Sequence, residues 1–232
     1  MSLPREIVKL AVGAANRPIA RYRFSRVLAS TAPPYKIEIG AHRTRRPGWI
    51  DTEVSWRARH YMDAAKGWPV PTSSASHIYA DNVIEHLRMQ PNRRLFREAH
   101  RVLVPGGRIR LATPDVEYLV ACYTKRDGET RRLLELSNLK NYEAHHPVDL
   151  LRVAFQECGH HIGYLWDFQA LRDELALAGF GDIRRFESGQ SDDPDLRGLE
   201  IREEFALVVE AEAVKSPSPK QSALLKVPDP AH

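Results

Sequence analysis

Polar side chains that can accept and donate protons follow directly on a short apolar segment in the middle of the chain. Residues 77–80 have the composition of a buried strand, and the polar stretch Asp81 to His86 comes immediately after them. A second predicted strand, Arg108 to Ala112, alternates charged and apolar side chains and leads into Thr113 to Asp115. Because ligands of open α/β sheets bind outside the carboxyl ends of the strands, we expect these two polar stretches to face one crevice.

Strands and helices must alternate to position that crevice. Apolar residues at helical spacing predict a helix over Leu95–Leu103, which the Pro-Gly-Gly turn at 105–107 ends. A second helix, Asp167 to Ala178, is expected to stop at Gly179. Five further strands, seven in all with the two above, are predicted at residues 36–40, 49–54, 59–63, 182–187 and 204–211.

The amino-terminal segment is strongly basic. Residues 1–46 contain ten Lys or Arg and two Glu, whereas the whole chain has a net charge of +4. The apolar spacing of residues 1–31 is helical, and Pro18 predicts two short helices there. One interpretation is a solvated cover helix, and another is attraction to an anionic membrane surface or a phosphate-bearing substrate. We expect no nucleic-acid partner, since no aromatic–basic interleaving accompanies the charge.

The composition is that of an ordinary globular chain. It is 43% hydrophobic, and no stretch has the length of a membrane span or the pattern of a signal peptide. The two cysteines, Cys122 and Cys158, form no metal-type pair, which favours a reducing compartment. We therefore expect a cytoplasmic protein, with attachment to the inner membrane face as the alternative that the basic segment allows.

Three stretches, in this order, resemble class I S-adenosylmethionine-dependent methyltransferases of the type 11-like group. They are Asn-Val-Ile-Glu-His-Leu at 82–87, Arg-Val-Leu-Val-Pro-Gly-Gly-Arg at 101–108, and Pro114-Asp115. The resemblance implies an α/β fold with a Rossmann-like sheet of seven mostly parallel strands, the last antiparallel, and helices on both faces. The predicted division is a basic helical arm (1–34), a methyltransferase domain (35–213) containing a helical insertion or acceptor cap (116–166), and a disordered tail (214–232).

The resemblance also implies a site for S-adenosylmethionine as cofactor. Glu38 and Gly40 match the start of the first motif, where glycine lets the backbone approach the methionine part of the donor. Glu53 stands where the family has the acid that accepts the ribose hydroxyls, with Asp51 as the nearby alternative. The other matching positions are Asp63, the adenine-side acid, and the pocket-lining residues Asp81 and Asn82.

His42 departs from the family pattern, because a second glycine is usual at its position. The loop from Gly40 to Trp49 is also short, as in a compact bacterial subgroup that Pro47 to Ile50 resembles. Two outcomes follow from His42. Either its side chain points away and the donor binds, or the protein is a degenerate member that does not bind it.

Three histidines are candidates for catalysis, namely His86, His160 and His161, because histidine is the usual proton acceptor near neutral pH. We expect no metal. Asn82 stands where some quinone-forming relatives have a metal-binding acid, and the paired histidines match no zinc-ligand spacing.

The function that the resemblance implies is methyl transfer, by in-line displacement, to an oxygen of a small or glycosylated acceptor. The compact subgroup is associated with bacterial natural-product or cell-envelope sugar biosynthesis, so sugars and phosphosugars are the expected small-molecule partners. The alternative is a methyltransferase-like protein with a binding or scaffolding role, or with a reaction other than methylation.

Overall fold

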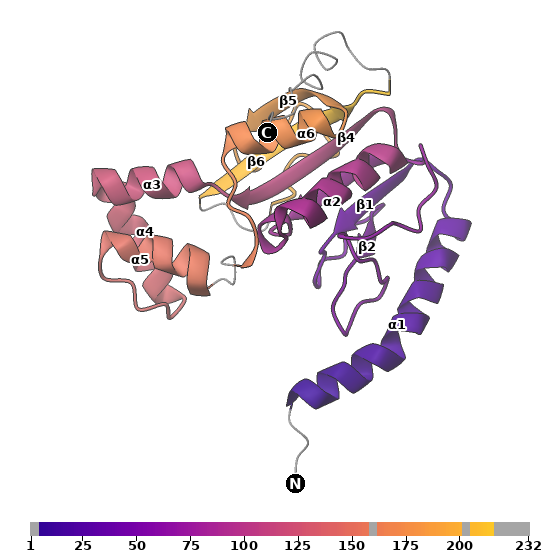
Figure 1. The fold of residues 1–232 in the computed structure, drawn as a ribbon, viewed down its shortest axis with the longest axis horizontal. Coiled ribbons are helices and arrows are strands. Elements are labelled where there is room, and N and C mark those ends of the chain that lie inside the picture. Colours follow the sequence, from indigo (N-terminus) through magenta and orange to yellow (C-terminus); the bar gives the residue numbers. More distant parts are fainter. Residues whose placement is uncertain (1–4, 158–161, 201–204, 216–232) are drawn as a thin grey trace, which may run out of the picture.

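A computed structural model describes residues 5–157, 162–200 and 205–215 (Figure 1). Its centre is a six-stranded sheet in the order β2-β1-β3-β4-β6-β5, in which β6 runs antiparallel to both neighbours and the other pairs are parallel. The strands are β1 (Tyr35–Ile39), β2 (Ile50–Thr52), β3 (Ala75–Asp81), β4 (Leu103–Pro114), β5 (Phe180–Phe186) and β6 (Ala206–Ala213). The mixed α/β architecture, mostly parallel with an antiparallel last strand, is as expected.

The expected seventh strand, at residues 59–63, is wrong for the described part of the chain. Tyr61 makes a single isolated bridge to Glu53, closed by backbone hydrogen bonds from Glu53 to His60 and from Met62 to Glu53. Since β2 has only three residues, it presents too short an edge for a further ladder.

Helices α2 (Met89–Val102) and α6 (Phe168–Leu177) lie together across one face of the sheet (Figure 1). They bury the apolar side chains of β3 and β4, including Ile78, Ile109 and Leu111. The expectation of helices on both faces is wrong for the described residues. On the opposite face Tyr79 packs against Leu196 and Leu199, which belong to the non-helical segment 187–200.

That opposite face carries buried charges, which explains why an irregular segment can cover it. Arg110 is fully buried and lies 2.5 Å from Glu200 and in direct contact with Glu210. Its guanidinium also donates to the Gln190 carbonyl at 2.9 Å. Buried charges of this kind are stable only when paired, so the segment 187–200 supplies partners that an apolar helix face would lack.

The amino-terminal segment forms one helix, α1 (Arg5–Ser30), rather than the two predicted. Pro18 removes a single backbone donor, and Figure 1 shows that the helix axis bends partway along instead of breaking. Tertiary contacts offset the loss. Phe24 and Leu28 enter the main core, and Ala20 packs with Tyr61.

Three helices, α3 (Val116–Lys125), α4 (Gly128–Leu139) and α5 (Pro147–Arg152), occupy the region of the predicted helical cap. They extend beyond the end of β4 (Figure 1) and share a small core of Cys122, Leu133 and Leu150. In the described ranges, no helix combines the length and apolar character needed to cross a bilayer. Of the tail predicted at 214–232, Val214 and Lys215 are described and hydrogen-bond to Gly179 and Arg101, and residues 216–232 lie outside the described residues. Cys158, His160 and His161 lie outside them as well.

Candidate functional site

A pocket of about 390 Å³ lies where β1, β2 and β3 end. That volume is in the usual range for small-molecule sites, roughly 300–1,000 Å³. The pocket contains most of the residues that the resemblance assigned to the cofactor. Its lining residues are Ile39, Gly40, His42, Glu53, Val54, Met62, Asp63, Ala64, Ala65, Asn82, Val83, His86 and Leu87.

Gly40 ends β1 in a conformation that requires glycine. Its φ is +69°, and a Cβ at this position would lie 2.5 Å from Cγ2 of Val83. The chain then continues into Ala41, whose amide donates to the Thr52 carbonyl at 3.0 Å. The missing side chain therefore leaves backbone exposed at the pocket wall, as close approach of a ligand needs.

His42 adopts the left-handed backbone conformation that glycine favours, with φ +48°. Its amide donates to Oε2 of Glu53 at 3.1 Å, and its exposed side chain is part of the pocket lining. The backbone therefore behaves as the usual glycine would, while an imidazole occupies part of the rim.

The Glu53 carboxylate is held by three amides. Besides the His42 amide, it accepts from Val54 at 2.6 Å and from Ser55 at 3.1 Å. A carboxylate has about four lone-pair positions, so roughly one remains for a ligand hydroxyl. Asp51 does not line the pocket and lies instead beside Arg59 and His60, at 3.8 and 3.5 Å. Of the two acids considered from the sequence, Glu53 is the one in the pocket.

Asp63 and Asn82 also line the pocket. Asp63 accepts from the Ala65 amide at 3.1 Å and pairs with Lys66 at 3.1 Å. Asn82 has φ +52°, and its side-chain amide donates to Asp81 at 2.7 Å. These local contacts fix the two polar groups beside the apolar wall formed by other lining residues.

Two residues predicted to bind the cofactor do not line the pocket. Glu38 is 2% exposed, accepts from the Thr44 hydroxyl at 2.8 Å and lies 3.3 Å from Arg46. Burial raises the pKa of the Glu38 carboxyl above its ordinary value, although Thr44 and Arg46 oppose that shift. Asp81 accepts from the Tyr79 hydroxyl at 3.1 Å as well as from Asn82. Both acids therefore hydrogen-bond to residues of neighbouring segments rather than lining the pocket.

His86 lines the pocket from the short 3₁₀ turn Ile84–His86. The Asn92 side chain anchors this turn by donating to the carbonyls of Ile84 and Leu87, at 2.8 and 2.9 Å. Of the three candidate catalytic histidines, His86 alone falls within the described residues. It is exposed and borders the pocket.

The sequence did not indicate the apolar wall or the contact that covers the His86 turn. Met62, Val83 and Leu87 line the pocket. Val83 and Leu87 belong to the motif at 82–87, but nothing in the sequence marked any of the three as part of an apolar wall. Gly163 passes so close to the turn that a Cβ would lie 1.7 Å from the Glu85 carbonyl oxygen. The sequence signal for this contact was Gly163 itself, which lies in a segment without clear helical or strand periodicity.

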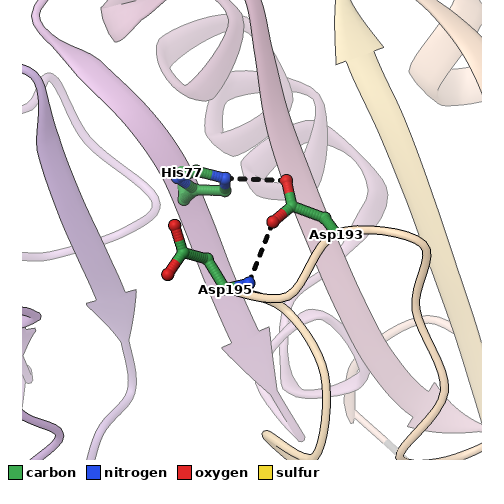
Figure 2. A group of neighbouring side chains, drawn as sticks. All are labelled: His77, Asp193 and Asp195. Atoms are coloured by element: carbon green, nitrogen blue, oxygen red, sulfur yellow. Dashed lines mark hydrogen bonds and ion pairs between the residues drawn. The ribbon is translucent and has the colours of Figure 1, made fainter.

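Figure 2 shows a separate polar cluster in which His77, on β3, faces Asp193 and Asp195 on the segment 187–200. His77 Nε2 lies 3.0 Å from Asp193, and one potential ligand atom from each residue falls within 4.8 Å of the others. Lys36 already supplies a cation, 2.6 Å from Asp195. The contacts therefore join the covering segment to the sheet, and we assign the cluster a structural role.

These features fit the chemistry of an adenosyl sulfonium ligand. Exposed backbone at Gly40 allows close approach, Glu53 retains an acceptor position for a hydroxyl, and Met62, Val83 and Leu87 offer an apolar surface. Among the described lining residues there are carboxylates and amides but no Lys or Arg, and the nearby Lys66 is paired with Asp63.

A family model described as a methyltransferase domain matches residues 10–111. No curated protein matches the chain. A solved structure titled as the CurJ carbon methyltransferase is 14% identical, with TM-score 0.45, covering 80% of this chain and 50% of that one. A Thermotoga maritima protein titled as a possible histamine N-methyltransferase is 17% identical, with TM-score 0.49, covering 90% and 99%. A putative O-methyltransferase from Nostoc punctiforme is 12% identical, with TM-score 0.45, covering 90% and 61%.

This chain thus spans half the length of the CurJ structure and nearly all of the Thermotoga maritima one. The family match over residues 10–111 includes β1, β2, β3 and most of β4. It supports the resemblance drawn from the sequence: residues 10–111, somewhat less than half of the chain, are similar to a methyltransferase domain.

Proposed function

We propose that the protein transfers a methyl group from S-adenosylmethionine to an oxygen of a small or glycosylated acceptor. The observation that carries the proposal is the assembly of Gly40, Glu53, Asp63 and Asn82, from four separate stretches of sequence, around one pocket. A family match alone does not require these side chains to meet. Their convergence supplies the hydrogen-bond acceptors and the close backbone approach that such a donor needs.

When bound, S-adenosylmethionine supplies an electrophilic methyl group on a sulfonium. The residues of the chain bind the donor and orient it toward the acceptor. Glu53 accepts a ribose hydroxyl at its remaining lone pair, and the backbone at Gly40 contacts the methionine part. Holding the acceptor in line with the methyl group is the main source of rate enhancement in this kind of displacement.

His86 is the proposed general base. With the donor bound, the methyl group would pass from sulfur, which keeps the electron pair of the broken bond, to the acceptor oxygen, and that oxygen would lose its proton. The acceptor proton passes to a ring nitrogen of His86. A base of this kind contributes typically 10²–10⁴-fold, so its removal lowers the rate without abolishing donor binding.

A second candidate, a methyltransferase-like protein that binds a ligand without methylation, is favoured by one observation. The His42 side chain is part of the pocket lining where the family has glycine, and the three amides leave Glu53 little spare capacity. Donor binding by the purified protein separates the two candidates.

Release of S-adenosylhomocysteine in the presence of sugars, phosphosugars and phenols tests the proposal. We expect acceptor-dependent release by the wild type, at least about ten-fold slower release by His86→Gln, and unchanged release by His145→Gln, an exposed histidine beyond the pocket. Equal rates for the two variants would refute the role of His86. Failure of a folded protein to bind the donor would refute methyl transfer itself.

A further inference from the structure

A second and larger hollow, about 860 Å³, lies between α1, the loop after β1 and the segment 56–60. It is separate from the methyl-donor pocket, with which it shares no lining residue. We call it the arginine groove. Its lining residues are Val12, Asn16, Tyr22, Arg23, Arg26, Val27, Ser30, Arg45, Trp56, Arg57, Ala58, Arg59 and His60.

The arginine groove gathers five guanidinium groups and no carboxylate among its lining residues. Within the described ranges, Arg23, Arg26 and Arg45 have no side-chain hydrogen bond or ion pair. Arg57 lies over the ring of Trp56 at 4.1 Å, and Arg59 has only a distant partner, Asp51 at 3.8 Å. Charges of one sign gathered along a concave surface raise the local potential and attract ions of the opposite sign.

The walls of the arginine groove are held in place by contacts that involve none of its charges. The Asn16 side chain donates to the carbonyls of Trp56 and Ala58, at 3.2 and 2.9 Å. A Cβ on Gly13 would lie 3.1 Å from Trp56 Cβ, which shows how closely α1 approaches the segment. Arg23 and Arg26, from one wall, therefore face a surface whose position is set independently of any ligand.

We propose that the arginine groove binds the diphosphate group of a diphosphate ester. Guanidinium forks match phosphate oxygens in bidentate geometry, and clusters of arginine are the usual recognition element for such anions. A single phosphate would leave most of the five guanidiniums unpaired, whereas two linked phosphates engage several. The aromatic rings of Trp56 and Tyr22 flank the charges and offer surfaces for the organic part of the ester.

The site does not depend on methyl transfer, because it is built from residues outside the donor pocket. It does adjoin that pocket through shared loops. In the loop after β1, His42 lines the donor pocket and Arg45 lines the arginine groove. In the loop after β2, Glu53 lines the donor pocket and Trp56 lines the arginine groove.

Calorimetric titration of the full chain with inorganic pyrophosphate tests the proposal directly. Arg26→Glu and Arg45→Glu remove exposed, unpaired arginines from opposite walls, and Arg97→Glu on α2 is the matched control, since it is exposed, unpaired in the described structure and outside the groove. We expect each groove variant to weaken binding about ten-fold or more and the control to leave it within two-fold, a loss in line with charge-assisted hydrogen bonds. Orthophosphate should bind more weakly than pyrophosphate.

A second arm identifies the source of the diphosphate. A uridine diphosphate sugar is titrated in solution, and flotation is measured with phosphatidylcholine vesicles that either contain or lack a polyprenyl diphosphate. Binding that is lost in Arg26→Glu and Arg45→Glu supports the groove in either arm. Loss in the titration indicates a soluble ester, and loss in the flotation indicates a lipid-linked one. The proposal is overturned if neither diphosphate binds, or if Arg97→Glu weakens binding as much as the groove variants do.

Discussion

Gly40→Ala is the substitution for which the structure gives the sharpest expectation. Two separate penalties apply at this position. A left-handed φ of +69° costs a residue with a Cβ about 1–2 kcal/mol, and the new Cβ would lie 2.5 Å from Val83 Cγ2. Relieving an overpacked contact of this kind typically costs about 1–3 kcal/mol. The free energy of unfolding should therefore fall by about 2–5 kcal/mol.

Gly48→Ala provides the matched control. Gly48 has φ +79°, but nothing lies within 4 Å of its would-be Cβ, and it does not line the pocket. It should therefore show the backbone penalty alone, about 1–2 kcal/mol. The difference between the two variants isolates the contact with Val83.

Urea unfolding of both variants, together with Val83→Ala and the double variant, measures these terms. We expect a favourable coupling of at least about 1 kcal/mol between Gly40→Ala and Val83→Ala, because the smaller residue 83 makes room for the methyl group. Calorimetry should show that Gly40→Ala also weakens donor binding while Gly48→Ala does not. Equal destabilisation by the two glycine substitutions, with no coupling to residue 83, would refute the close approach.

Three further outcomes are expected. His42→Gly should keep the fold and bind S-adenosylmethionine at least as tightly as wild type, since the backbone is already glycine-like; a ten-fold weaker affinity in calorimetry would mean that the imidazole contacts the ligand. Gly163→Ala should destabilise by at least about 2 kcal/mol in urea unfolding, because its Cβ would meet the Glu85 carbonyl, whereas Gly128→Ala, with open space around it, should not. Burial lowers the pKa of His100 below its ordinary 6.5, so the free energy of unfolding should fall as pH drops from 6.5 through the folded-state pKa. Thermal melts of His100→Gln should lose that pH dependence, and a profile equal to that of the wild type would contradict the assignment.

Local sequence signals predicted the elements that carry strong periodicity or punctuation. The helix expected at Asp167 to Ala178 is α6, capped by the Asp167 side chain on the Ala170 amide and ended by Gly179 at φ +101°. The strands predicted at 77–80 and 108–112 likewise fall within β3 and β4, which pair with each other. The Pro-Gly-Gly stretch expected as a turn lies inside β4 instead, at the register shift of that ladder. In the helix and the two strands, the local preference and the tertiary structure agree.

The failures lie where tertiary contacts decide the outcome. Pro18 predicted a break, but the burial of Ala20 and Phe24 keeps α1 continuous. A strand was expected at 59–63, yet Tyr61 makes only an isolated bridge, to Glu53 just after the three-residue β2.

The sequence predicted only part of the candidate site, because tertiary contacts decide which residues line the pocket. Residues at strand ends, such as Gly40, Glu53 and Asn82, line the pocket together. Glu38 carries the same motif signal but lies two residues before Gly40, within β1, where side-chain alternation directs it away from the face of Ile37 and Ile39 to the charged face of the sheet. The basic charge of residues 1–46 was a sequence signal, with a phosphate-bearing substrate among its interpretations. The arginine groove itself was not predicted, because its walls come from α1 and from residues 45–60, which carry no shared pattern.

The central claim is that Glu53, in this pocket, binds the ribose of S-adenosylmethionine or its product. Titration of S-adenosylhomocysteine into wild type, Glu53→Gln and Asp51→Asn tests it most directly, since Asp51 is a nearby acid outside the pocket. The account predicts micromolar binding by wild type and Asp51→Asn, and affinity lower by roughly ten- to a hundred-fold for Glu53→Gln, the worth of a hydrogen bond to a charged group. Absence of binding by folded wild type, or equal loss in the two variants, would contradict it.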